Sequence, residues 1–185
     1  MAQELELKIL TDENGFRECL SLLREDTAGT EDRYVQVNYY FDTPDLALSR
    51  AHSMLRVRRK KNRLYLQYKN KRRRVDDALL CDEMEAFLTE FPRSVNPFRY
   101  FEGAPDLECR LLGDLVTHRT DFEFPGAIVS LDENIYLGKT DFEIEIEGER
   151  EAIAAVAARL PLTGDKTGDG KFSRFVKAYQ NYYGD

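Results

Sequence analysis

Charged side chains recur at every second position in several short segments of the chain. They are Glu4, Glu6 and Lys8; Arg56 and Arg58; Lys69 and Lys71; Glu83 and Glu85; and Glu143, Glu145 and Glu147. Carboxylates bind hard cations such as Mg²⁺ and Mn²⁺, whereas arginine and lysine bind phosphate oxygens. Both kinds of side chain are needed to hold a polyphosphate together with a divalent metal.

Each of these segments has the two-residue period of a β-strand, with one charged face and one apolar face. A solvated sheet face is the ordinary explanation for charge at alternate positions. It explains the whole set poorly, because three glutamates in line, at positions 143, 145 and 147, repel one another unless positive groups compensate. The acidic segments also lie at both ends of the series and the basic ones in its middle. We therefore predict that the charged faces line an interior.

The hydrophobic pattern predicts the elements that position these faces. Strands are predicted near residues 3–9, 34–41, 54–59, 63–71, 79–85, 116–122, 127–136 and 140–147, and helices from an N-cap at Thr11 to about residue 25, over 149–160 and over 172–183. A hairpin is predicted at Lys61-Asn62, a helix start at Thr43-Pro44, and short helices around Pro92, Pro97 and Pro105.

These elements predict an α+β fold: a closed eight-stranded antiparallel β-barrel with a charged interior, covered by the flanking helices. We expect one domain over residues 1–185. The net charge of −7 disfavours binding to nucleic acid, and no apolar run suits a membrane span or a signal peptide. Three separated cysteines indicate reduced thiols. A cytoplasmic protein is expected.

The charged segments resemble, in order, the motifs of the CYTH superfamily, the triphosphate tunnel metalloenzymes, which include class IV adenylate cyclases and thiamine triphosphatases. The run from Glu4 to Lys8 resembles the ExExK signature of that family. The other matching segments are Tyr40-Phe41-Asp42-Thr43-Pro44, Leu55-Arg56-Val57-Arg58, Leu66-Gln67-Tyr68-Lys69, Glu83-x-Glu85, Arg119, Leu131-Asp132, the strand from Phe142 to Glu147, and Gly170-Lys171-Phe172-Ser173-Arg174. The resemblance covers nearly the whole chain and implies a tunnel-forming barrel.

The resemblance also implies roles for individual residues. Metal ligands would be Glu4, Glu6, Asp132, Glu143 and Glu145, with Mg²⁺ or Mn²⁺ as cofactor. Phosphates would be held by Lys8, Arg56, Arg58, Lys69, Arg119 and Lys171, and the catalytic set would be Glu4, Glu6, Lys8 and Lys171. Glu83, Glu85 and Glu147 would have supporting roles.

The expected activity is metal-dependent hydrolysis of a small-molecule triphosphate, either inorganic triphosphate, thiamine triphosphate or a nucleoside triphosphate. Two alternatives stay open. One is a class IV adenylate cyclase, which makes cyclic AMP and pyrophosphate from ATP. The other is a non-catalytic module that binds polyphosphate or nucleotide. The acidic strands argue against such a module, because an anion binder has no use for carboxylates without a metal. Besides the triphosphate, a second copy of the chain in a homodimer is a conceivable partner.

Overall fold

The computed structural model describes the backbone of residues 5–26, 30–75, 78–166 and 169–184 and, outside residues 71–82, their side chains. Within these residues, nine strands form one sheet in the order β1-β9-β8-β7-β2-β3-β4-β5, and β6 pairs with β7. The chain forms two compact units, residues 1–35 with 116–170 and residues 36–115 with 171–185. Strands β2 (Thr30–Asp42) and β7 (Cys109–Phe124) contribute residues to both units.

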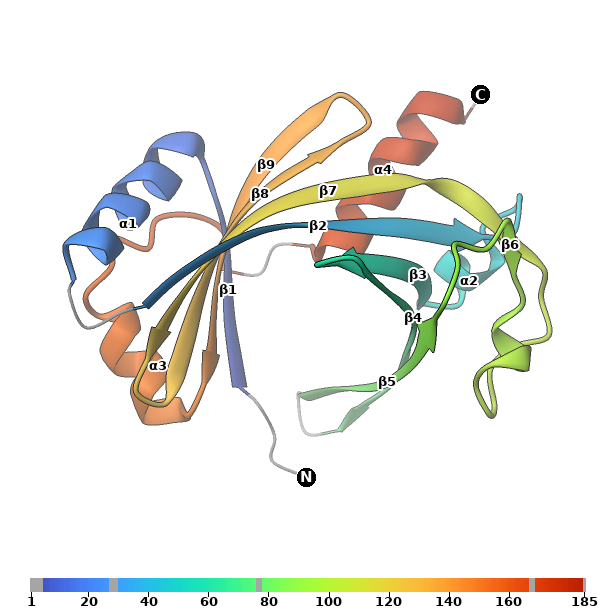
Figure 1. Ribbon diagram of the computed structural model, residues 1–185, viewed down its shortest axis with the longest axis horizontal. Helices are drawn as coiled ribbons and strands as arrows, with labels where there is room; N and C mark the ends of the chain where they lie inside the picture. The colour runs from blue at the N-terminus through green and yellow to red at the C-terminus, as the bar shows by residue number, and fades with distance from the viewer. Residues whose placement is uncertain (1–4, 27–29, 76–77, 167–168, 185) are drawn as a thin grey trace. The chain divides into compact units, whose positions relative to one another are not determined.

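The first unit is a sheet with two helices. It contains β1 (Leu5–Thr11), β8 (Ala127–Tyr136) and β9 (Lys139–Gly148), together with the parts of β2 and β7 that belong to it, and the helices α1 (Glu13–Glu25) and α3 (Arg150–Ala157). Both β1 and β8 pair with β9 in antiparallel register. Helices α1 and α3 lie on the same side of these strands (Figure 1).

The alternation of charged and apolar residues separates the two faces of this sheet. On one face, Ile144 and Ile146 of β9 join a core with residues of β8, and Cys19 and Leu23 of α1 and Val156 of α3 cover them. Removal of this apolar surface from water stabilises the unit by roughly 25 cal/mol for each Å² buried. The intervening residues of β9, which are glutamates, must then project from the opposite face.

Helix α1 begins one residue later than the sequence pattern predicts. Its N-cap is Asp12, whose carboxylate accepts a hydrogen bond of 2.8 Å from the backbone N–H of Gly15. Thr11, the predicted cap, is the last residue of β1. Both residue types can cap a helix, and the pairing of β1 with β9 extends through Thr11, which leaves the capping position to Asp12.

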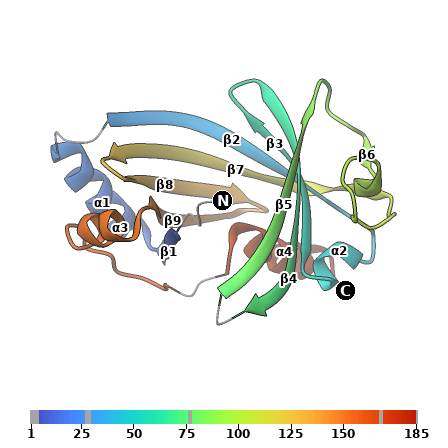
Figure 2. The ribbon, with the colours of Figure 1, turned by 90° about the horizontal axis from the view of Figure 1, so that it is seen from below.

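The second unit contains three antiparallel strands that follow one another in sequence, β3 (Ser53–Lys60), β4 (Arg63–Val75) and β5 (Ala78–Leu88) (Figure 2). The remaining elements are the parts of β2 and β7 that belong to this unit, β6 (Ser94–Val95), the 3₁₀ helix η1 (Pro97–Arg99), α2 (Ala47–Arg50) and α4 (Lys171–Tyr183). The predicted β3–β4 hairpin is confirmed. Its turn residues Lys61 and Asn62 have φ angles of 46° and 63°, as a tight two-residue hairpin turn requires.

One face of this second sheet is apolar and the other is charged. Leu55 and Val57 of β3 pack with Leu66 and Tyr68 of β4 in a buried core. Because side chains alternate along a strand, Arg56 and Arg58 project from the opposite face. Directly opposite Arg56 in the pairing of β3 with β4 is Gln67.

Several predictions about the fold need correction. The antiparallel sheet with flanking helices is confirmed, but the strand order of the described residues runs from β1 to β5 without a pairing that closes it, so a closed barrel is not confirmed. The predicted helix start at Thr43-Pro44 is wrong. There the chain turns, because the carboxylate of Asp42 accepts hydrogen bonds from the N–H groups of Thr43, Leu48 and Ser49 at 2.7–2.9 Å. The first helical residue of α2 is Ala47.

The short helices predicted around Pro92 and Pro105 are also wrong, since of the three proline sites only Pro97 lies in a helical turn. The predicted helix over residues 149–160 is shorter in the structure and ends at Ala157. No described helix is long and apolar enough to cross a membrane.

Candidate functional site

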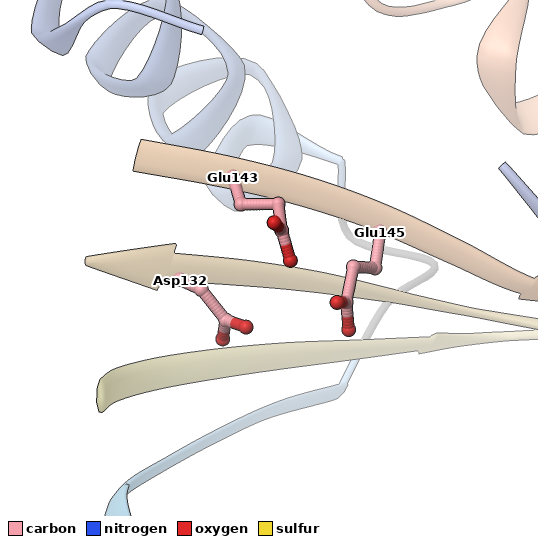
Figure 3. Close-up of side chains that lie close together, drawn as sticks. All are labelled: Asp132, Glu143 and Glu145. Carbon is pink, nitrogen blue, oxygen red and sulfur yellow. The ribbon is translucent and has the colours of Figure 1, made fainter. Parts of the chain in front are cut away.

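Three carboxylates converge on the charged face of the first unit. Asp132 of β8 and Glu143 and Glu145 of β9 each place one carboxylate oxygen within 4.8 Å of the others (Figure 3). The pairing of β8 with β9 sets Asp132 directly opposite Glu143. The side chains of Asp132 and Glu143 have no solvent exposure, and that of Glu145 is 12% exposed. These carboxylates are therefore shielded from water, unlike those of an ordinary solvated sheet face.

Arg119 of β7 binds two of these carboxylates at once. Its Nε and one terminal nitrogen donate to the two oxygens of Asp132 at 2.6 and 2.5 Å, and that terminal nitrogen also lies 2.6 Å from Glu145. Burial alone would lower the pKa of Arg119, but the hydrogen bonds and charge of Asp132 and the charge of Glu145 outweigh burial and raise it. The arginine is therefore a permanent cation within the cluster.

Lys8 of β1 approaches the cluster from the other edge of β9. Its ammonium nitrogen lies 3.1 Å from an oxygen of Glu145, 4.0 Å from one of Glu143 and 3.1 Å from one of Glu6. Glu6 is 43% exposed and lies outside the group of three carboxylates. Glu147 is an exposed residue, and Glu4 lies outside the described residues.

A further carboxylate on the same face of β7, that of Asp121, was not among the predicted site residues. Asp121 accepts hydrogen bonds from the hydroxyls of Tyr34 and Ser130, at 2.8 and 2.7 Å, and lies 3.9 Å from Nε of Arg119. Burial and the hydrogen bond to Asp121 raise the pKa of Tyr34. Asp121 follows Arg119 by two residues, so the two-residue period could have identified it. Tyr34 and Ser130 had no such signal.

The donor chemistry of this cluster fits Mg²⁺ or Mn²⁺. Hard divalent cations take carboxylate oxygens, and two of the three carboxylates here are fully buried. When ionised, the three carboxylates carry three negative charges, and Lys8 and Arg119 supply two positive charges. The remaining negative charge favours the binding of a further cation. Asp132, Glu143 and Glu145 are the residues that could hold it.

The second unit has a separate row of polar residues on its charged face. Nε of Arg56 donates to the amide oxygen of Gln67 at 2.7 Å, and the amide nitrogen of Gln67 donates to Glu85 at 2.6 Å. Arg56 is only 7% exposed. The Glu85–Gln67 pair thereby fixes the orientation of a buried guanidinium.

The other predicted basic residues of the second unit lie in different surroundings. Nε of Arg58 donates to the amide oxygen of Asn38 at 3.0 Å. Lys69 forms a 2.7 Å ion pair with Glu83, in which both side chains are more than a third exposed. Lys171 is half-buried at the first residue of α4.

Comparison with known proteins identifies the family. The model of the CYTH domain matches residues 2–168. The chain belongs to the CYTH family. The resemblance of its charged segments to that family is therefore confirmed, and residues 2–168 include every predicted site residue except Lys171.

Individual CYTH-like proteins agree with this assignment. A curated protein of Bacillus subtilis strain 168, named "Putative triphosphatase YjbK", is 31% identical over 159 residues, which cover 80% of this chain and 79% of that protein. A crystal structure from Bacillus halodurans, described as a "putative adenylate cyclase", has a TM-score of 0.71 and 26% identity over 93% of this chain and 96% of that one.

The Hippeastrum protein HpAC1, described as a "putative adenylyl cyclase" with a dominant triphosphatase activity, has a TM-score of 0.71. It is 22% identical, and the match covers 95% of this chain and 96% of that one. At that identity the likeness shows a shared fold.

Proposed function

We propose that the chain hydrolyses a small-molecule triphosphate with the help of a divalent cation. The observation that carries this proposal is the packing of Asp132, Glu143 and Glu145 against the cations Lys8 and Arg119 on one sheet face. A metal-bound triphosphate needs oxygen ligands for its cation and positive donors for its phosphates. The name of the Bacillus subtilis relative supports the same class of reaction.

The proposal gives each cluster a role. Asp132, Glu143 and Glu145 would hold Mg²⁺ or Mn²⁺, with Glu4 and Glu6 as the further predicted ligands. The bound cation would neutralise charge on the phosphate oxygens. Lys8 and Arg119 would bind phosphate oxygens. The proposed phosphate-binding residues of the second unit are Arg56, Arg58, Lys69 and Lys171, and the proposed supporting residues are Glu83, Glu85 and Glu147.

The chemical step is phosphoryl transfer to water. The water oxygen bonds to the terminal phosphorus while the bond from that phosphorus to the bridging oxygen breaks, which yields orthophosphate and a diphosphate. The water protons pass to solvent or to the departing phosphate oxygens. Lys8 and Arg119 would stabilise the negative charge that builds up on the transferred and leaving groups, which is the main contribution a protein makes to this reaction.

The proposal is tested by measuring phosphate release from inorganic triphosphate, thiamine triphosphate and ATP, each with Mg²⁺, Mn²⁺ or EDTA. We expect release of orthophosphate from at least one substrate with a metal and none with EDTA. Absence of any turnover across the panel would refute the proposal. Turnover that is unchanged in EDTA would refute the role of the metal.

An adenylate cyclase is the second candidate, because the Bacillus halodurans structure with that description is 26% identical to this chain over most of its length. Chromatography of the products from ATP separates the two activities. Triphosphate hydrolysis gives ADP and orthophosphate, whereas cyclisation gives cyclic AMP and pyrophosphate. If cyclic AMP is the main product, the activity of the chain is cyclisation and not hydrolysis.

A further inference from the structure

Two buried polar groups in the second unit have no hydrogen-bond partner among the residues that the structure describes. They are the amide nitrogen of Asn38 and the hydroxyl of Tyr40, and both side chains have no solvent exposure. Nearly all buried donors in native proteins are paired, because an unpaired one costs about 1–3 kcal/mol. Two such donors on one strand, two residues apart, indicate that another molecule supplies their acceptors.

The pairing of β2 with β3 places these donors beside two arginines. Asn38 lies opposite Arg58, and Tyr40 lies opposite Arg56. Directly opposite side chains share a face, with their Cβ atoms about 4.5–5.5 Å apart. The four side chains therefore form one compact group on the charged face, with two neutral donors next to two guanidinium groups.

Both neutral donors are held in place by contacts that the protein itself provides. The amide oxygen of Asn38 accepts from Nε of Arg58 at 3.0 Å, which fixes the plane of the amide and leaves its nitrogen as the unpaired end. The ring of Tyr40 packs against Phe172 and Phe175 of α4, with ring centroids 5.0 and 4.8 Å away. Donors that are already ordered lose little conformational entropy when a ligand binds.

The chemistry of this group indicates the ligand that it suits. Two guanidinium groups attract an anion, and the neutral donors add hydrogen bonds without adding charge. A phosphoryl group combines negative charge with several acceptor oxygens on one atom. We propose that the amide of Asn38 and the hydroxyl of Tyr40 are further binding groups that donate to the oxygens of a phosphoryl group held by Arg56 and Arg58. This inference rests on the proposed function, because it assigns the phosphate chain of the triphosphate as the ligand.

Tyr40→Phe tests the hydroxyl without disturbing the ring contacts with α4. The probe is inorganic triphosphate, and its Kd is measured by calorimetry in EDTA, so the result does not depend on turnover. We expect the Kd to rise about tenfold, the usual effect of one hydrogen bond to a charged ligand. The thermal midpoint of the ligand-free variant should equal or exceed that of the wild type, because the deleted hydroxyl has no partner in the protein.

Asn38→Asp tests the amide nitrogen, because it keeps the oxygen that Arg58 uses and replaces the donor with a carboxylate oxygen. We expect the Kd for triphosphate to rise at least about tenfold. Two matched controls should change the Kd by less than about twofold. Tyr39→Phe alters the neighbouring tyrosine, which packs on Phe91, and Asn62→Asp makes the same charge change at an exposed turn.

The possible results separate this inference from the proposed function. Weaker binding in both site variants, with unchanged controls, supports the inference even if the wild type hydrolyses nothing. Equal Kd values in the wild type and both site variants overturn the inference and leave hydrolysis unaffected. A lower thermal midpoint of Tyr40→Phe with an unchanged Kd also overturns it, because the hydroxyl would then be satisfied without the ligand. If the wild type does not bind inorganic triphosphate in EDTA, the inference fails, whereas the proposed function is decided separately by the turnover assays with metal.

Discussion

Arg119 and Asp132 lie opposite each other on β7 and β8 and are joined by two hydrogen bonds of 2.6 and 2.5 Å. The carboxylate has no solvent exposure and the arginine is 18% exposed. Loss of one partner from such a pair leaves a buried charge without compensation. The pair should therefore matter to stability as well as to the chemistry of the site.

Arg119→Ala should lower the free energy of unfolding by about 3–5 kcal/mol, the usual cost of breaking a buried ion pair. Urea denaturation followed by circular dichroism measures this change. Arg110→Ala is the matched control, because Arg110 lies on the same strand and is exposed. Its effect should stay within about 0.5 kcal/mol. Equal stability of the Arg119 variant and the wild type would contradict the structural role given to the pair.

Glu143→Gln should reduce stabilisation by metal. A cation that binds only the folded protein raises its unfolding temperature with concentration, so Mn²⁺ should raise the midpoint of the wild type. In the variant, the Kd for Mn²⁺ should rise at least about tenfold. Glu133→Gln is the control, since Glu133 follows Asp132 on β8 and contacts His118. A similar Mn²⁺ shift in wild type and Glu143→Gln would exclude this residue as a ligand.

Cys19 and Cys109 should resist alkylation in the folded protein at pH 8. Burial raises the pKa of the Cys19 thiol to about 11 and that of Cys109 to about 12. Because the thiolate is the reactive form, only about one Cys19 in a thousand is ionised at pH 8. Peptide mapping after iodoacetamide treatment measures the labelling, with protein in urea as the control. Rapid labelling of either cysteine in the native protein would contradict the burial.

The same raised pKa values predict how stability responds to alkaline pH. A thiol whose pKa is higher in the folded protein than the usual value of 9 contributes fully to stability below pH 9. The contribution is lost as the pH rises toward about 11, because the unfolded chain then releases its proton more readily. Cys19→Ala should therefore show a smaller loss of stability between these pH values than the wild type.

Gly148→Ala should destabilise the first unit more than Gly138→Ala. Gly148 has a φ of 149°, and an added Cβ would lie 2.2 Å from the carbonyl oxygen of Gly126 and 2.8 Å from Cα of Ala127. Gly138 has a φ of 72° with nothing within 4 Å of an added Cβ. Gly138→Ala should cost about 1 kcal/mol from its backbone conformation alone, and Gly148→Ala clearly more. Thermal denaturation of both variants decides this, and equal costs would contradict the close approach.

The sequence predicted the charged faces of the strands but could not pair them. The alternation of Glu143, Ile144 and Glu145 shows locally which residues share a face. The contact between Lys8 and Glu145 depends on the register of β1 against β9, which joins segments far apart in the chain. No local pattern encodes that register. For the same reason, the strand count could not show whether the first and last strands of the order pair.

Other differences between prediction and structure have local causes. Thr11 and Asp12 are adjacent and both suit a helix N-cap, so the pattern alone could not choose between them. Tyr34 and Ser130 entered the site through contacts with Asp121, although neither carries a charge that would single it out. The family resemblance supplied Asp132, because its segment, Ser130-Leu131-Asp132-Glu133-Asn134, has polar residues at every position but one.

The strict alternation along β9 limits how this chain can change in evolution. Loss or gain of a single residue within β9, ahead of Glu143, would exchange the two faces of the strand. Ile144 and Ile146 would then replace the glutamates beside Arg119, and the glutamates would enter the core beneath α1 and α3. Insertions and deletions within β9 should therefore be tolerated only in steps of two residues. The neighbouring turn at Gly138 is open to solvent and should tolerate changes of one residue as well as of two.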